Sequence, residues 1–121
     1  MPVKKILVAE DSPTERQHLQ EVLSKLGYVV ITAENGEEAL QKVRSEHTDL
    51  VLMDVVMPGT NGFQATRAMA RDAQLQHIPV IICSSKGQET DRIWGMRQGA
   101  HAYLVKPLDL SVLAAKIAAL P

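Results

Sequence analysis

Five short apolar runs recur along the chain, and each is followed, after a polar turn, by a segment with helical spacing. The runs span Val3–Ala9, Tyr28–Ala33, Leu50–Met53, Val80–Cys83 and Ala102–Val105. Near-continuous apolar strands of this kind are typical of a parallel sheet that is covered on both faces. Strands that alternate with helices through short connections predict an α/β fold with a doubly wound, five-stranded parallel sheet.

The first helical segment carries clear start and stop signals. Ser12 is a good N-cap, Pro13 takes the first helical position, and Glu15 completes a Ser-x-x-Glu capping box. Gly27 is expected to close the helix in a left-handed conformation. The apolar stripe of this helix consists of Leu19, Val22, Leu23 and Leu26.

The other helices are predicted from the same periodicity. One follows the turn at Asn35-Gly36, two more are expected over 63–73 and 90–98, and the last begins at Asp109 or Ser111. In the helix after Asn35-Gly36 the inward-facing positions are Ala39, Leu40 and Val43, and in the helix over 63–73 they are Ala65, Ala68 and Met69. The last helix carries Val112, Leu113, Ile117 and Leu120.

Composition narrows the class of protein further. A chain of 121 residues that is 45% hydrophobic can form one domain with a sizeable core. The net charge of −1 provides no basic field for nucleic acid or an anionic membrane, and no apolar run has membrane-spanning length. Cys83 is the only cysteine, so an internal disulfide is excluded and a buried structural thiol in a reducing compartment is expected. We therefore expect a single cytoplasmic domain over 1–121, with no output domain attached.

Polar residues stand at the carboxyl ends of four of the predicted strands. Glu10 and Asp11 follow the first strand, Asp54 the third, Ser84 the fourth and Lys106 the fifth. In open α/β sheets ligands bind at this edge. Each residue alone has an ordinary explanation: a solvated acidic pair, a turn serine, an exposed lysine. Asp54 is harder to dismiss, because an unpaired carboxylate at an apolar strand end is costly.

Taken together, these residues fit phosphoryl chemistry. Three carboxylates gathered at one edge repel each other, and a cation offsets that cost. Hard oxygen ligands in a partly open site suit Mg2+. Lys106 adds a positive charge and Ser84 a hydroxyl donor around Asp54, which is placed to accept a phosphoryl group as an aspartyl phosphate.

Four stretches of the chain resemble the receiver domains of two-component response regulators, the CheY-like family. They are "ED" after the first strand, "LVLMDVVMPGTNG" around Asp54, "PVIICSS" and "GAHAYLVKP". The resemblance covers essentially the whole chain and implies the strand order 2-1-3-4-5. Within the family, "EDSPTE", "MPGTNGFQATR" and "KGQETDRIWGMRQGA" are most similar to stand-alone receivers of chemotaxis-like systems that control twitching motility by type IV pili.

The resemblance assigns roles residue by residue. Asp54 matches the phosphoacceptor, Glu10 and Asp11 the acidic metal pair with Asp11 as the direct ligand, and the Val56 carbonyl completes the metal shell. Ser84 matches the switch hydroxyl and Lys106 the lysine that binds phosphoryl oxygens. A second group of matches is the Lys106–Pro107 peptide bond, which is cis in this family, and Tyr103, the aromatic that changes rotamer on activation.

The same resemblance implies a partner-binding output face made of the fourth helix, the fifth strand and the fifth helix. Trp94 lies in that predicted helix and is either plain packing or a partner contact. Two positions depart from the family pattern. Ser85 replaces the usual alanine beside the switch hydroxyl, and Val56 is apolar where many members are polar, so its side chain is expected to give no direct help to self-dephosphorylation.

The leading interpretation is a signalling switch that a histidine kinase phosphorylates on Asp54 with Mg2+ as cofactor. It would bind a downstream protein or drain phosphate from a shared kinase, and it would not be an enzyme acting on other substrates. A flavin carrier on the same sheet is disfavoured by the acidic first loop and by an aromatic content of only 3%. A hydrolase with an aspartyl-phosphate intermediate would need a second carboxylate close after Asp54, where Val55 and Val56 stand. An interaction module that keeps only the fold stays open.

Overall fold

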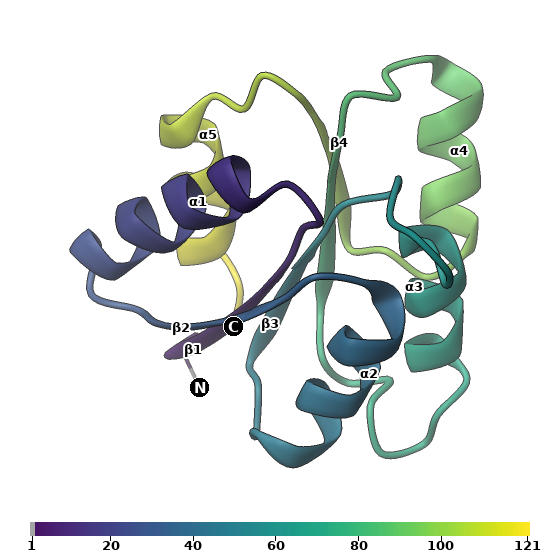
Figure 1. Ribbon diagram of the computed structural model, residues 1–121, viewed down its shortest axis with the longest axis horizontal. Helices are drawn as coiled ribbons and strands as arrows, with labels where there is room; N and C mark the ends of the chain where they lie inside the picture. Colours follow the sequence, from purple (N-terminus) through teal and green to yellow (C-terminus); the bar gives the residue numbers. More distant parts are fainter. Residues whose placement is uncertain (1) are drawn as a thin grey trace.

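The computed structural model describes residues 2–121 and contains one sheet of five parallel strands in the order β2-β1-β3-β4-β5 (Figure 1). The strands are β1 (Lys5–Ala9), β2 (Val29–Ala33), β3 (Leu50–Met53), β4 (Val80–Ser84) and β5 (Ala102–Val105). The helices are α1 (Pro13–Lys25), α2 (Gly36–Ser45), α3 (Gly62–Ala70), α4 (Glu89–Arg97) and α5 (Leu110–Ala118). The predicted fold class and strand order are confirmed.

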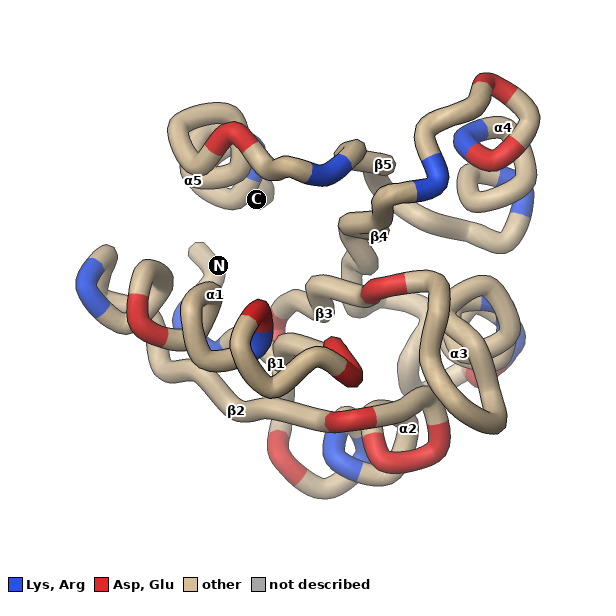
Figure 2. The backbone as a smooth tube through the Cα atoms, turned by 45° about the horizontal axis from the view of Figure 1, so that its top comes forward, with Lys and Arg blue, Asp and Glu red and all other residues tan. Residues whose placement is uncertain are grey.

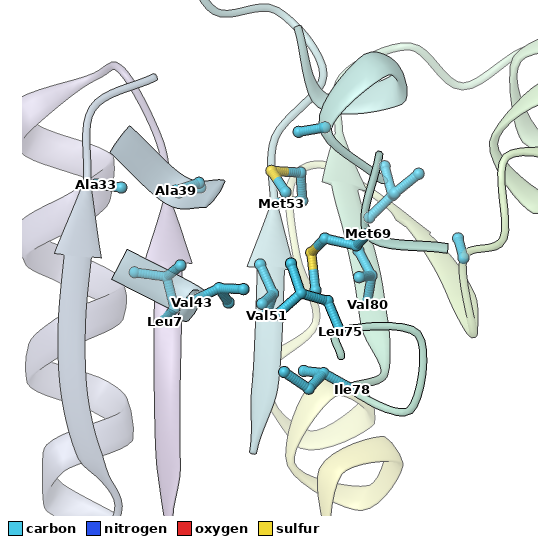
Figure 3. Packing of buried hydrophobic residues seen from close by; sticks show 14 of the residues in the cluster. Leu7, Ala33, Ala39, Val43, Val51, Met53, Met69, Leu75, Ile78 and Val80 are labelled. Atoms are coloured by element: carbon cyan, nitrogen blue, oxygen red, sulfur yellow. The ribbon is translucent and has the colours of Figure 1, made fainter. Parts of the chain in front are cut away.

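The helices cover both faces of the sheet, as Figure 1 shows, and this explains the apolar runs. Alternate residues of a strand point to opposite faces. In β1, Leu7 and Ala9 therefore pack with α2 and α3, while Ile6 and Val8 pack with α1 and α5. Figure 3 shows the first of these two clusters, in which Val43 of α2 lies near Leu7 of β1. A strand buried on both faces has no polar side, so its sequence does not alternate.

The ends of α1 follow the predicted signals only in part. Ser12 is the N-cap, and its side chain accepts a hydrogen bond from the backbone N–H of Glu15. Gly27 has a φ of 99°, as a left-handed cap requires. Leu19 and Leu23 are buried, but Leu26 is 52% exposed. The prediction of Leu26 as part of the inner stripe was wrong, because this residue is the C-cap and lies past the last turn that contacts the sheet.

The third and fifth helices differ from expectation in smaller ways. α3 ends at Ala70 rather than at residue 73, because the Asp72 side chain accepts a hydrogen bond from the backbone N–H of Gln74 and starts a turn. In α5, Leu113 and Ile117 are buried as predicted, whereas Val112 is 43% exposed. The remaining element boundaries agree with the predictions within two residues. Among the described helices, none has the length and apolar character needed to cross a membrane.

Candidate functional site

The strand register brings the predicted site residues to one edge of the sheet. Ala9 of β1 pairs with Met53 of β3, so the residues that follow, Glu10 and Asp54, emerge side by side. The backbone N–H of Asp54 donates to the carbonyl of Ala9 at 3.0 Å and fixes this alignment. Figure 2 shows acidic positions where β1 and β3 end, with a basic position following β5 (Figure 2).

Three carboxylates form a compact cluster at this edge. Glu10, Asp11 and Asp54 each offer an oxygen atom, and these atoms lie within 4.8 Å of one another. Glu10 and Asp54 are buried, whereas Asp11 is exposed to solvent. Three hard oxygen donors with one open side match the ligand preferences of Mg2+, which keeps several of its waters when bound to protein. The residues therefore fit the expected metal.

Lys106 supplies the counter-charge to this cluster. Its Nζ atom lies 2.5 Å from Oε1 of Glu10 and 2.9 Å from Oε2 of Glu15, and both are hydrogen bonds. The third carboxylate, Asp54, lies at 3.6 Å, which is an ion-pair distance rather than a hydrogen bond. Lys106 is therefore hydrogen-bonded to the two glutamates, whereas it forms only a longer ion pair with Asp54.

The titration of the site reflects burial and this ion pairing. Burial raises the pKa of Glu10 to about 8, although the hydrogen bond from Lys106 opposes the rise. Burial also lowers the pKa of Lys106, but its hydrogen bonds to Glu10 and Glu15 outweigh that effect, so the net shift is upward and the lysine stays charged. The hydrogen bond from Lys106 holds the pKa of Glu15 below its usual range.

The role of Glu15 differs from the prediction of a capping box. Its backbone N–H does donate to Ser12 Oγ, at 3.3 Å, but its carboxylate turns away to Lys106. The backbone N–H of Ser12 donates instead to Oε2 of Glu10, at 3.2 Å. Only half of the box forms, because the acidic pair supplies the acceptor that Glu15 was expected to supply. Glu15 is thus a site residue that the sequence pattern had assigned to helix capping alone.

A close backbone approach shapes the loop that follows Asp54. A Cβ atom at Gly62 would overlap the carbonyl oxygen of Asp54, and it would also lie 2.8 Å from the carbonyl carbon. The backbone N–H of Gly62 donates to the carbonyl of Val55 at 2.9 Å. The loop can fold back onto the end of β3 only with glycine here. Val56, exposed to 57%, projects from the same loop.

Ser84 and Tyr103 meet at the backbone of Lys86. Ser84 is fully buried at the end of β4, and its Oγ accepts a hydrogen bond from the Lys86 N–H at 3.1 Å. The Tyr103 hydroxyl donates to the Lys86 carbonyl at 2.6 Å. The loop between β4 and α4 is therefore linked to both residues through the backbone of Lys86, a residue that the sequence motifs had not singled out.

The other singled-out residues occupy the following positions. The Lys106–Pro107 peptide bond is cis. Trp94 lies on α4 and is 49% exposed. Cys83 is buried in β4, and burial raises the pKa of its thiol to about 12, which suits a structural residue better than a nucleophile. The four histidines are exposed, and none belongs to a metal-binding cluster among residues 2–121.

Comparison with known proteins agrees with this geometry. The sequence pattern of the response regulator receiver domain matches residues 6–118. Protein PilH of Pseudomonas aeruginosa is 53% identical over 109 residues, which cover 90% of each chain. Among solved structures, the chemotaxis protein CheY4 of Vibrio cholerae is 30% identical with a TM-score of 0.88, over 95% of this chain and 96% of that one. The BeF3-activated N-terminal receiver domain of Klebsiella pneumoniae RstA is 27% identical with a TM-score of 0.88, over 94% and 95%.

Proposed function

This chain belongs to the response regulator receiver domain family, and from that membership we propose that it is a stand-alone response regulator phosphorylated on Asp54 by a histidine kinase. The observation that carries the proposal is the convergence of three carboxylates and Lys106 at the ends of β1, β3 and β5. The match to PilH, which spans 90% of both chains, supports the assignment to this family.

In the proposed reaction, a carboxylate oxygen of Asp54 attacks the phosphorus of a phosphohistidine. A new P–O bond forms, the P–N bond breaks, and the imidazole of the kinase leaves with the electron pair. Lys106 and Ser84 would then bind phosphoryl oxygens and stabilise their negative charge. The product is a changed conformation rather than a released compound, so the protein catalyses only its own phosphorylation and dephosphorylation.

Glu10, Asp11, Asp54 and the carbonyl of Val56 would hold Mg2+. When bound, the metal supplies positive charge that neutralises the carboxylates and the incoming phosphoryl group. The support lies in the donor chemistry of the acidic cluster, since all three side chains present oxygen atoms at mutual distances within 4.8 Å.

We further propose that phosphorylation is read out on the face formed by α4, β5 and α5. The Lys86 backbone joins Ser84 to Tyr103, so a shift of Ser84 toward a phosphoryl group would disturb the Tyr103 hydroxyl bond. Large apolar side chains are exposed on these elements, as expected of a surface that binds a protein. They are Ile93, Trp94, Met96, Val105 and Val112.

The similarity to PilH favours a chemotaxis-like pathway that controls pilus-driven motility, in which the protein binds a target or acts as a phosphate sink. A cytoplasmic location fits the free Cys83 thiol, because a reducing compartment keeps cysteines in that form.

The proposal is tested by intact mass after incubation with acetyl phosphate and Mg2+, for the wild type and for Asp54→Asn. We expect one phosphate of added mass in the wild type, none without Mg2+ and none in the variant. A wild type that takes up neither phosphate nor beryllofluoride would instead be a binding module that keeps only the receiver fold.

A further inference from the structure

Lys106 lies within ion-pair distance of three carboxylates, those of Glu10, Glu15 and Asp54, but it forms hydrogen bonds with only the first two. Its ammonium group has three N–H donors, and the described hydrogen bonds go to Glu10 and Glu15. Asp54 lies beyond hydrogen-bond distance, at 3.6 Å. A phosphoryl group on Asp54 would take the remaining N–H of Lys106 and, because it offers several oxygens, would compete with the two glutamates for the other two.

The two glutamates differ in how they respond to a metal. Glu10 belongs to the carboxylate cluster that fits Mg2+, so a bound cation would compete with Lys106 for its oxygens. Glu15 lies outside that cluster, on the first turn of α1, and its side chain is 51% exposed. The hydrogen bond between Glu15 and Lys106 therefore does not involve any residue of the acidic cluster.

We propose that Glu15 is a positioning residue that holds Lys106 in the unphosphorylated arrangement and competes with the phosphoryl group for its ammonium. The inference rests on the proposed function, because it concerns the phosphoryl-binding state of the same site. It follows from the geometry of this chain, in which the Glu15 carboxylate forgoes the Ser12 cap and reaches the lysine. Removing this carboxylate should favour every state in which Lys106 turns to Asp54.

The test is the concentration of beryllofluoride that half-saturates the protein with Mg2+ present, measured from backbone amide NMR shifts. Glu15→Gln keeps the size of the side chain but removes its charge. We expect it to lower the half-saturating concentration by about two- to five-fold, the range for a partly exposed ion pair.

Two further variants separate this role from a structural one. Glu15→Asp keeps a negative charge near the helix N-terminus, but its side chain is about 1.5 Å shorter and should lose the contact with Lys106. It is expected to behave like Glu15→Gln, whereas a helix-stabilising role would leave it like the wild type. Glu21→Gln, on an exposed residue of the same helix whose carboxylate accepts a hydrogen bond from Gln17, is the matched control and should not change the half-saturating concentration.

The outcomes are distinct. Equal half-saturation in the wild type and both Glu15 variants, or weaker binding in the variants, would overturn the inference while leaving the proposed function standing. If the wild type binds no beryllofluoride at all, the proposed function fails and the inference fails with it.

Discussion

The centre of the sheet and its β5 edge are packed in opposite ways. β1 from Ile6 to Ala9 and the whole of β3 are at most 1% exposed, and they carry the acidic cluster on their carboxyl ends. Along β5 every residue is at least partly exposed, and α4 beside it buries only Gly95. The carboxylates therefore follow strands that cannot shift without opening both apolar clusters. Tyr103 lies in β5 and Lys106 directly follows it, and this strand is less deeply buried.

This difference suits a switch, because local rearrangements occur where few buried apolar contacts oppose them. The β4–α4 loop bonds to Ser84 on the inner side and to Tyr103 on the outer side, so it joins the two regions. A fixed Asp54 beside a less tightly packed β5 edge would let a change at Asp54 reach the exposed surface of α4. Substitutions at matched positions in the two regions test this difference in packing.

The largest effect is expected from Gly62→Ala, beside Asp54. The added Cβ would overlap the backbone carbonyl of Asp54, and backbone at the end of a buried strand cannot move aside. We expect the free energy of unfolding to fall by about 3 kcal/mol or more, measured in urea. A loss below about 1 kcal/mol would show that the centre yields as easily as the edge.

The next effect concerns the buried carboxyl of Glu10 in the metal-free protein. Its pKa is raised from 4.5 to about 8, so the folded state holds this proton more tightly than the unfolded state. The resulting stabilisation is complete below pH 4.5 and is lost as the pH rises to 8. Relative to Glu10→Gln, the wild type should lose on the order of 2 kcal/mol across that window, less than half of the full linkage value of about 5 kcal/mol, because the site opens to solvent at Asp11 and water screens part of the effect.

Subtracting the Glu10→Gln profile cancels the pH dependence of every ionisable group that behaves alike in the two proteins. Lys106 does not contribute, since its raised pKa acts only above 10.5. A difference that stays flat between pH 4.5 and 8 would show that the carboxyl is ionised throughout, and that its pairing with Lys106 outweighs its burial.

At the β5 edge of the sheet, Gly95→Ala is the counterpart of Gly62→Ala. The added Cβ would lie 2.8 Å from a ring carbon of Tyr103 and 3.1 Å from Ile82, which are side chains rather than backbone. The half-exposed ring can turn aside, so we expect a loss of about 1 kcal/mol. Hydrogen exchange in the β4–α4 loop should also quicken, because the Tyr103 bond to the Lys86 carbonyl is disturbed. A loss as large as that of Gly62→Ala would remove the contrast between the two regions.

The sequence predicted the buried strands and the residues at their ends better than it predicted contacts between distant side chains. Apolar runs and the residues after them predicted the sheet, its helices and the acidic cluster, because a buried parallel strand leaves a distinctive pattern and its end has a known position. The partner of Glu15 could not be predicted, since the capping-box spacing explains that residue equally well and Lys106 lies 91 positions away. Leu26 kept the helical spacing past the point where the sheet ends, so periodicity alone misplaced it.

The smallest structural effect is expected at Val56, which follows the fully packed Val55 yet is 57% exposed. Val56→Asn should change stability by less than about 0.5 kcal/mol, as is usual for exposed positions. An amide here could hydrogen-bond a water near Asp54, which the valine cannot do. We therefore expect the phosphoryl lifetime to shorten by about three-fold, equal to about 0.6 kcal/mol of barrier. Decay of the phosphorylated mass over time measures this for both proteins, and a longer lifetime in the variant would show that Val56 itself promotes hydrolysis.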